Sequence, residues 1–218
     1  MFKPREAPVD GATTVYQLFE PEDVDDAPLP VILFLHGRGE CGSDGLAQTA
    51  VGIGPAIRKD PKRFPALVVF PQASRGYGWR GFNLDAAFAA LDDVTGSFDV
   101  DPARVYVTGI SMGGYGTSAA TARQPERFAA AVPICAGFDR TAAPVVDRIA
   151  RIPHWLFHGD ADAIIPVEQS RTMAAVLRAR GGDVRYTEYP GMGHNSWDAA
   201  YRDRELMPWM LGQRRELT

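Results

Sequence analysis

Ser111 stands in a sequence context that can turn its hydroxyl into a nucleophile. It lies within Gly109-Ile110-Ser111-Met112-Gly113, a G-x-S-x-G pattern. The β-branched and aromatic residues 105–108 before it predict a buried strand, and the small residues 114–120 after it predict the start of a helix. A serine in such a strand–turn–helix unit has its side chain pushed outward, and the flanking glycines let strand and helix approach closely. We therefore predict that Ser111 attacks an electrophilic carbon.

A serine hydroxyl is a weak nucleophile until a base takes its proton, and four histidines compete for that role. His36 precedes the serine, and His154 and His158 flank a predicted strand ahead of any suitable acid. His194 lies late in the chain, in a loop whose glycines suit a backbone that must reach over a sheet. We predict that His194 is the base.

The carboxylate that orients the base is predicted in the segment after the apolar strand 154–158. Asp160 and Asp162 both follow that strand, so both project at its carboxyl end, where the sites of α/β proteins lie. We favour Asp162 as the acid and expect Asp160 to bond to nearby loop amides. His158 with these two aspartates also suggests a metal site, but no other ligand cluster supports one. We predict no metal and no organic cofactor.

The order Ser111, Asp162, His194 is the triad order of the α/β hydrolases. The chain resembles this superfamily over nearly its whole length. Within it, the chain is similar to the small lidless carboxylesterases, which include the phospholipase/carboxylesterase group, the predicted-peptidase esterases, and the polyhydroxybutyrate depolymerase-like and feruloyl esterases. The segments that carry the resemblance are Leu35–Glu40, Gly109–Gly114, His158–Pro166 and Gly193–Trp197.

Hydrolysis by this triad also needs two donors for the negatively charged oxygen of the intermediate. The strand–turn–helix unit around Ser111 is called a nucleophile elbow. Its geometry assigns one donor to the backbone N–H of Met112, directly after the nucleophile. The resemblance implies that the second comes from Arg38, with Gly39 as the alternative. Losing one such donor typically costs ~10²–10³ in turnover. The sequence His36-Gly37 also fits a tight turn at a strand end, with His36 bonded to the loop backbone. This turn is compatible with a role of the same loop in binding the charged oxygen.

The loop 72–82 combines aromatic residues, arginines and glycines, a mixture that can line a binding cleft. We predict that Trp79 forms a wall of the acyl or alcohol site, exposed to ligand. The competing interpretation packs Trp79 and Phe82 under the domain. Trp197, close to His194, is either a second wall of the substrate site or a core residue at a helix start. The net charge of −4 and the lack of a basic stripe argue against a nucleic-acid partner.

The bulk properties predict a single soluble domain over residues 1–218. The 218 residues suffice for one α/β core, and 45% hydrophobic with 23% charged residues is ordinary for a globular protein. We find no secretory leader and no run of ~20 apolar residues, so we expect a cytoplasmic location without a membrane partner. Cys41 and Cys135 do not make a disulfide framework; we expect two free thiols, although a bridge between them stays open. The oligomeric state is not predicted.

Alternating strand-like and helix-like segments predict an α/β-hydrolase fold, with a mostly parallel sheet and helices on both faces. We predict strands at Thr14–Phe19, Val31–His36, Ala66–Pro71, Arg104–Ile110, Ala130–Cys135, His154–His158 and Val184–Tyr189. We predict helices at Asn83–Gly96, Met112–Arg123, Val167–Arg180 and Trp197–Met210. Only 18 residues, 136–153, separate two of these strands, so we expect an open site without a lid domain. The acidic run 22–26 is predicted to be a solvated loop.

These features predict a serine carboxylesterase that acts on a small-molecule ester. Ser111 would attack the ester carbonyl, and water activated by His194 would hydrolyse the acyl-enzyme. Because no lid is expected, we predict small, soluble or aromatic acyl esters as substrates and no activation by lipid interfaces. The same triad serves peptidases and thioesterases, which remain alternatives, as does a catalytically silent binding domain.

Overall fold

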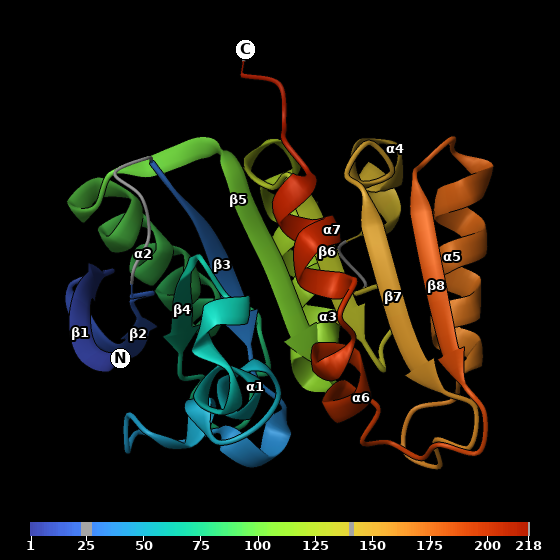
Figure 1. Ribbon diagram of the computed structural model, residues 1–218, viewed down its shortest axis with the longest axis horizontal. Helices are drawn as coiled ribbons and strands as arrows, with labels where there is room; N and C mark the ends of the chain where they lie inside the picture. Colours follow the sequence, from blue (N-terminus) through green and yellow to red (C-terminus); the bar gives the residue numbers. More distant parts are fainter. Residues whose placement is uncertain (23–27, 140–141, 218) are drawn as a thin grey trace.

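The strands assemble into one eight-stranded sheet in the order β1-β2-β4-β3-β5-β6-β7-β8 (Figure 1). The computed structural model describes residues 1–22, 28–139 and 142–217. Most of the predicted acidic loop 22–26 lies outside the described residues. The pairs β1–β2 and β2–β4 are antiparallel, and the other neighbouring strands run parallel. The predicted α/β fold with a mostly parallel sheet is therefore confirmed.

The strands and helices have the following bounds. The strands are β1 (Phe2–Val9), β2 (Ala12–Phe19), β3 (Leu29–Leu35), β4 (Leu67–Pro71), β5 (Val100–Ile110), β6 (Ala130–Ile134), β7 (His154–Gly159) and β8 (Val184–Tyr189). The helices are α1 (Ile53–Lys59), α2 (Phe82–Ser97), α3 (Met112–Arg123), α4 (Val146–Ile149), α5 (Glu168–Ala179), α6 (Trp197–Arg202) and α7 (Leu206–Gly212).

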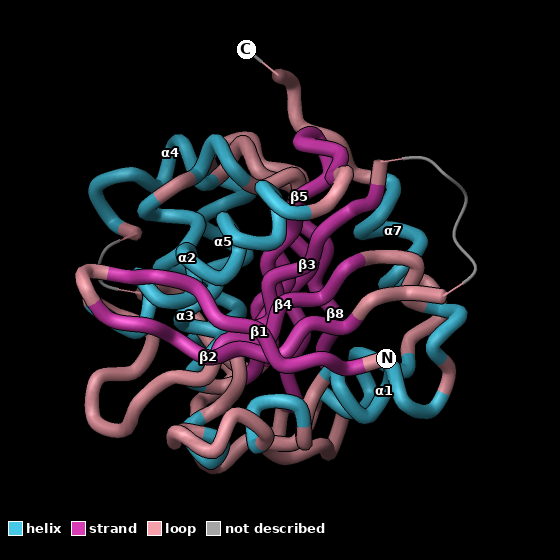
Figure 2. Tube along the Cα trace, turned by 90° about the vertical axis from the view of Figure 1, so that its left-hand side faces the viewer, coloured by secondary structure: helices cyan, strands magenta, loops and turns pink. Residues whose placement is uncertain are grey.

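Side-chain alternation along β3 explains why both faces of the sheet are covered. Val31, Leu33 and Leu35 pack in one core cluster with α2 and α3, whereas Ile32 and Phe34 pack in a second cluster with α1, α6 and α7. All five are fully buried, as expected for a parallel strand with a helix layer on each side. Figure 2 shows the two layers on opposite sides of the sheet, with α2, α3 and α5 on one side and α1 and α7 on the other.

The N-terminal strand β1 was not predicted from the sequence. It forms a hairpin with β2 through Asp10-Gly11, whose φ values of 46° and 76° fit a two-residue hairpin turn. Its apolar residues are few, and it holds Pro4 and Pro8, which weaken the strand pattern but are tolerated at the edge of a sheet. The dipeptide Asp10-Gly11 was the sequence signal from which this hairpin could have been predicted.

The predicted single helix Trp197–Met210 is wrong, because the structure divides it into α6 and α7. The chain leaves helical geometry at Asp203, where ψ is 126°. Pro208 supplies the physical reason. It has no N–H to donate and its ring would clash with the carbonyl four residues earlier in a continuous helix, whereas the first turn of a new helix tolerates it.

The connection between β6 and β7 carries little extra structure. Between β6 and β7, the described residues form only a short 3₁₀ turn and the four-residue helix α4. None of the helices in the described part of the chain has the length and apolar character needed to cross a bilayer.

Candidate active site

Ser111 lies in the turn between β5 and α3 with strained backbone geometry, φ 53° and ψ −115°. The turn is fixed from both sides. The Ser111 amide donates to the carbonyl of Ile134 on β6 at 3.0 Å, and the Gly114 amide donates to the Ser111 carbonyl at 2.9 Å. A Cβ at Gly113 would collide with the carbonyl oxygen of Leu35, which explains why the second glycine of the pattern is required. Ser111 therefore lies in a strand–turn–helix unit, as the G-x-S-x-G pattern predicts.

The structure brings the three predicted triad residues into one hydrogen-bonded row. The Nε2 atom of His194 lies 2.9 Å from Ser111 Oγ, and its Nδ1 lies 2.7 Å from Asp162 Oδ2. A carboxylate only accepts, so Nδ1 carries the ring proton and Nε2 is free to accept the proton of Ser111. The Asp162 side chain is fully buried, while that of His194 is 22% exposed.

Asp162 is held by four donors. Its Oδ1 accepts hydrogen bonds from the amides of Ile164 and Ile165 at 2.8 and 2.9 Å, and its Oδ2 accepts from His194 and from Nε2 of His158 at 3.1 Å. Burial by itself raises the pKa of Asp162, but the bonds from His194 and the two amides outweigh it and hold the pKa below its usual range. The carboxylate therefore stays charged beside His194.

His158 does not contact Ser111 as a base would; its ring holds the carboxylate of Asp162 in place. Its Nδ1 lies 2.7 Å from Ser170 Oγ, and that oxygen lies 2.6 Å from the carbonyl oxygen of Ala136. All of these side-chain atoms are buried. The four-residue spacing from His158 to Asp162 was the only sequence signal for this contact. Sequence reasoning did not identify the network that links Asp162 to α5.

Asp160 takes the role predicted for it. Its Oδ1 accepts a hydrogen bond from the amide of Gly191 at 2.6 Å, which ties the loop after β7 to the loop that carries His194.

His36 anchors the loop after β3 rather than taking part in proton transfer. Its Nδ1 donates to the carbonyl of Gly37 at 2.6 Å, and its Nε2 accepts from the amide of Ala73 at 2.9 Å. Burial lowers the pKa of His36 to about 4, so the ring stays neutral at pH 7. The turn interpretation of His36-Gly37 is thus what the structure shows.

The two predicted oxyanion donors lie at the starts of helical segments. Met112 is the first residue of α3, and Arg38 is the first residue of a 3₁₀ turn, Arg38–Glu40. The first amides of a helix have no partner within the helix, so both are available to an incoming oxygen. Both residues line the same cleft as Ser111, as does the alternative Gly39.

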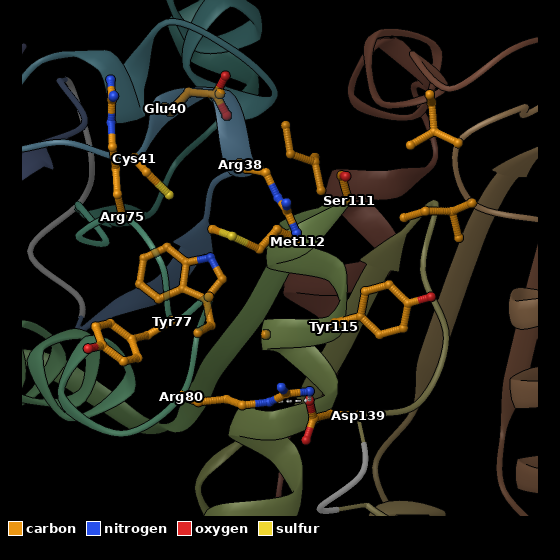
Figure 3. A pocket seen from close by; sticks show the side chains of 18 of the residues that line it. Arg38, Glu40, Cys41, Arg75, Tyr77, Arg80, Ser111, Met112, Tyr115 and Asp139 are labelled. Carbon is orange, nitrogen blue, oxygen red and sulfur yellow. Dashed lines mark hydrogen bonds and ion pairs between the residues drawn. The ribbon is translucent and has the colours of Figure 1, made fainter.

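A cleft of about 1220 Å³ surrounds Ser111. Figure 3 shows Arg38 and Met112 beside the serine, Tyr115 on one side, and Arg75 and Tyr77 on the other. Its lining residues are Gly37–Cys41, Arg75–Arg80, Ile110–Met112, Tyr115, Gly116, Asp139, Ile164, Ile165, His194 and Trp197. Sequence reasoning missed Arg75, Tyr77 and Tyr115 as individual lining residues.

The two predicted substrate-wall tryptophans differ in their placement. Trp79 borders the cleft but is only 2% exposed; its indole N–H donates to the carbonyl of His36 at 3.0 Å, and it packs against Gly116. The predicted exposure of Trp79 is therefore wrong, because the indole is used to support the loop. Phe82, expected to pack with it, is 49% exposed. Trp197 is half-buried, lines the cleft and stands edge-on to the His194 ring. It also packs against the core at the start of α6, so it is both a wall of the cleft and part of the core.

The two cysteines are buried free thiols. Cys135 has a φ of 43°, and its Sγ lies within 4.8 Å of donor atoms of Asp162 and His194. These three atoms are close enough to share a metal ion, but a metal would displace the hydrogen bond between Asp162 and His194. Burial raises the pKa of Cys135 to about 12, and a protonated thiol is a poor ligand and a poor nucleophile. The arrangement therefore fits a serine nucleophile better than a metal or cysteine site.

Comparison with known proteins agrees with this geometry. Residues 84–204 match the phospholipase/carboxylesterase family. A putative esterase, NocK, from Nocardia uniformis subsp. tsuyamanensis is 28% identical over 184 residues, covering 81% of this chain and 53% of that protein. An uncharacterized secreted protein of Arthroderma benhamiae is 28% identical over 203 residues, covering 77% of this chain and 21% of that protein.

Among solved structures, a thermostable esterase superposes with a TM-score of 0.89 at 34% identity, covering 98% of this chain and 63% of that chain. This chain thus spans about half or less of the length of these two curated relatives, and less than two thirds of the thermostable esterase. The family match covers more than half of the chain and includes the elbow, the acid and the base. The chain belongs to the phospholipase/carboxylesterase family of α/β hydrolases.

Proposed function

We propose that this chain is a serine carboxylesterase that works through an acyl-enzyme on Ser111. The observation that carries the proposal is the row from Ser111 Oγ through His194 to Asp162, with contacts of 2.9 and 2.7 Å. In this row each atom has the partner that proton transfer requires.

In the first half of the reaction, Ser111 Oγ attacks the ester carbonyl while His194 Nε2 takes the hydroxyl proton. The negative charge that develops on the carbonyl oxygen is stabilised by the amides of Met112 and Arg38. His194 then returns the proton to the leaving alcohol, and the acyl group remains on the serine. In the second half, His194 activates a water molecule that releases the acid and restores the hydroxyl.

The cleft supports small or aromatic acyl esters as substrates. Its exposed or half-buried aromatic and branched side chains include Tyr77, Tyr115, Trp197 and Ile164, which offer flat or branched contact surfaces within the cleft. Ile164 and Tyr77 are 70% and 76% exposed, so their apolar surfaces are free to meet a ligand. Peptide or thioester cleavage by the same triad remains the alternative function.

The test is hydrolysis of p-nitrophenyl esters, from acetate to palmitate, together with a ferulate ester. We expect cleavage of the short or aromatic members, no increase in rate above the micelle-forming concentration of the long ones, and no activity in Ser111→Ala. Ser97→Ala is a matched control, because Ser97 is an exposed serine at the far end of α2. Cleavage of a chromogenic peptide or a thioester in preference to every ester would contradict the proposal.

A further inference from the structure

Two arginines in the cleft form no salt bridge with any residue that the structure describes. The lining includes three, Arg38, Arg75 and Arg80. Arg80 is paired: its guanidinium donates to the buried carboxylate of Asp139 at 2.6 and 3.0 Å. Within the described residues, neither Arg38 nor Arg75 forms a salt bridge, although both side chains lie beside the cleft (Figure 3).

Glu40, which also lines the cleft, does not neutralise these charges. Its carboxylate is directed to the backbone amides of its own loop, at Gly37 and at Glu40 itself. Burial raises the pKa of Glu40. One carboxylate offsets at most one of the two positive charges, so net positive charge from the arginines remains available to a ligand.

The two arginines act on the same region from different loops. Arg38 follows β3 and Arg75 follows β4, and these strands are neighbours in the sheet. Both cations lower the pKa of the Cys41 thiol, opposing burial and Glu40, which raise it. Figure 3 shows Cys41 between Arg75 and Arg38, with Arg38 the nearer of the two to Ser111. A negatively charged group beside Cys41 is therefore attracted by both charges.

This local charge stands out because the chain as a whole carries a net charge of −4. We propose that the cleft selects esters that carry a carboxylate on the acyl or alcohol side, which the charges of Arg38 and Arg75 attract. The planar guanidinium matches a carboxylate with two parallel hydrogen bonds. The inference rests on the proposed esterase function and names the substrate class of the same site.

The test compares paired esters that differ in one charge. On the acyl side, p-nitrophenyl hemisuccinate is compared with p-nitrophenyl valerate; on the alcohol side, 4-carboxyphenyl acetate is compared with 4-acetylphenyl acetate. Each kcat/KM is divided by the rate of hydroxide hydrolysis of that ester. We expect at least one anionic member to be preferred by roughly 10- to 100-fold, the range for hydrogen bonds to a charged group.

The arginines are then replaced one at a time. Arg38→Gln and Arg75→Gln each lower the anionic-to-neutral ratio by about tenfold, and the ratio in the wild type falls as salt is added. Arg151→Gln is the matched control, because Arg151 is an exposed arginine that does not line the cleft, and it leaves the ratio unchanged. Thermal unfolding of each variant confirms that the change is not a loss of fold.

The inference is overturned if the anionic-to-neutral ratio of kcat/KM is one or less in both pairs, or if neither glutamine variant lowers it. In either case, hydrolysis of the neutral esters would still support the esterase proposal. If no ester is hydrolysed and Ser111 is not labelled by a fluorophosphonate, the esterase proposal fails and this inference fails with it.

Discussion

The cleft has two sides that are built in opposite ways. On the acid side, Asp162 is fully buried and holds four hydrogen bonds, and His158 behind it is bonded in turn to Ser170. On the arginine side, Arg38, Arg75 and Tyr77 are exposed, and the structure gives the two arginines no ionic partner among the described residues.

Under the proposed function, the acid side serves proton transfer and the arginine side serves ligand selection. Proton transfer needs atoms fixed in advance, because the donors act without reorganisation during the reaction. Ligand selection needs groups whose interactions are completed only when the ligand arrives. Changes on the acid side should therefore affect turnover and stability, and changes on the arginine side should affect selectivity with little effect on stability.

The largest effect is expected from Asp162→Asn. An asparagine keeps the shape but does not hold His194 in the tautomer that accepts the serine proton, so kcat falls by roughly 10⁴-fold. Steady-state hydrolysis of p-nitrophenyl acetate measures it. Asp160→Asn is the control, since the Asp160 carboxylate bonds to the loop amide of Gly191 rather than to His194, and it should change kcat by less than about tenfold. If Asp160→Asn were the more harmful of the two, the assignment of the acid would be wrong.

A second large effect concerns pH. Burial lowers the pKa of both His36 and His154 to about 4 in the folded state, against about 6.5 when unfolded. Between these values the unfolded chain binds more protons, so the free energy of unfolding is highest above pH 6.5 and falls as pH drops toward 4. The loss is roughly 3 kcal/mol for each histidine. Urea unfolding at pH 7.5, 5.5 and 4.5 measures it, and equal stability at the three pH values would contradict the buried neutral histidines.

A smaller loss is expected from Ser170→Ala on the acid side. The change leaves the carbonyl of Ala136 and the ring of His158 without their buried partner, which costs about 1–3 kcal/mol in the free energy of unfolding. Denaturant unfolding at pH 7.5 gives the value, with Ser97→Ala as the exposed control. A loss no greater than that of the control would mean that the acid side is not held through α5.

The smallest effect on stability is expected from Tyr77→Ala on the arginine side. Tyr77 is 76% exposed, so removing its ring should change the free energy of unfolding by no more than ~0.5 kcal/mol. The same unfolding experiment checks this. A loss above 2 kcal/mol would show that the arginine side is also part of the folded framework.

The sequence allowed the fold class and the positions of Ser111 and Asp162 to be predicted, because each follows a strand whose apolar pattern is strong. His194 was predicted instead from its late position in a loop with glycines, since β8 before it has no strong apolar pattern. The cleft lining was harder to predict. The loop 72–82 has no periodicity, so nothing in the sequence fixes that Trp79 turns inward to bond the loop after β3 while Arg75 and Tyr77 turn outward. The network behind Asp162 joins β7 to α5 and depends on tertiary packing. The single-domain organisation and the cytoplasmic location stay predictions.

The central claim is that His194 and Asp162 activate Ser111, and active-site labelling tests it most directly. The folded protein is treated with a fluorophosphonate, and the modified peptide is identified by mass spectrometry. We expect one adduct on the peptide that contains Ser111, no adduct in Ser111→Ala, and much slower labelling in His194→Gln. An unlabelled Ser111 in folded protein, or labelling that proceeds equally fast without His194, would contradict the account.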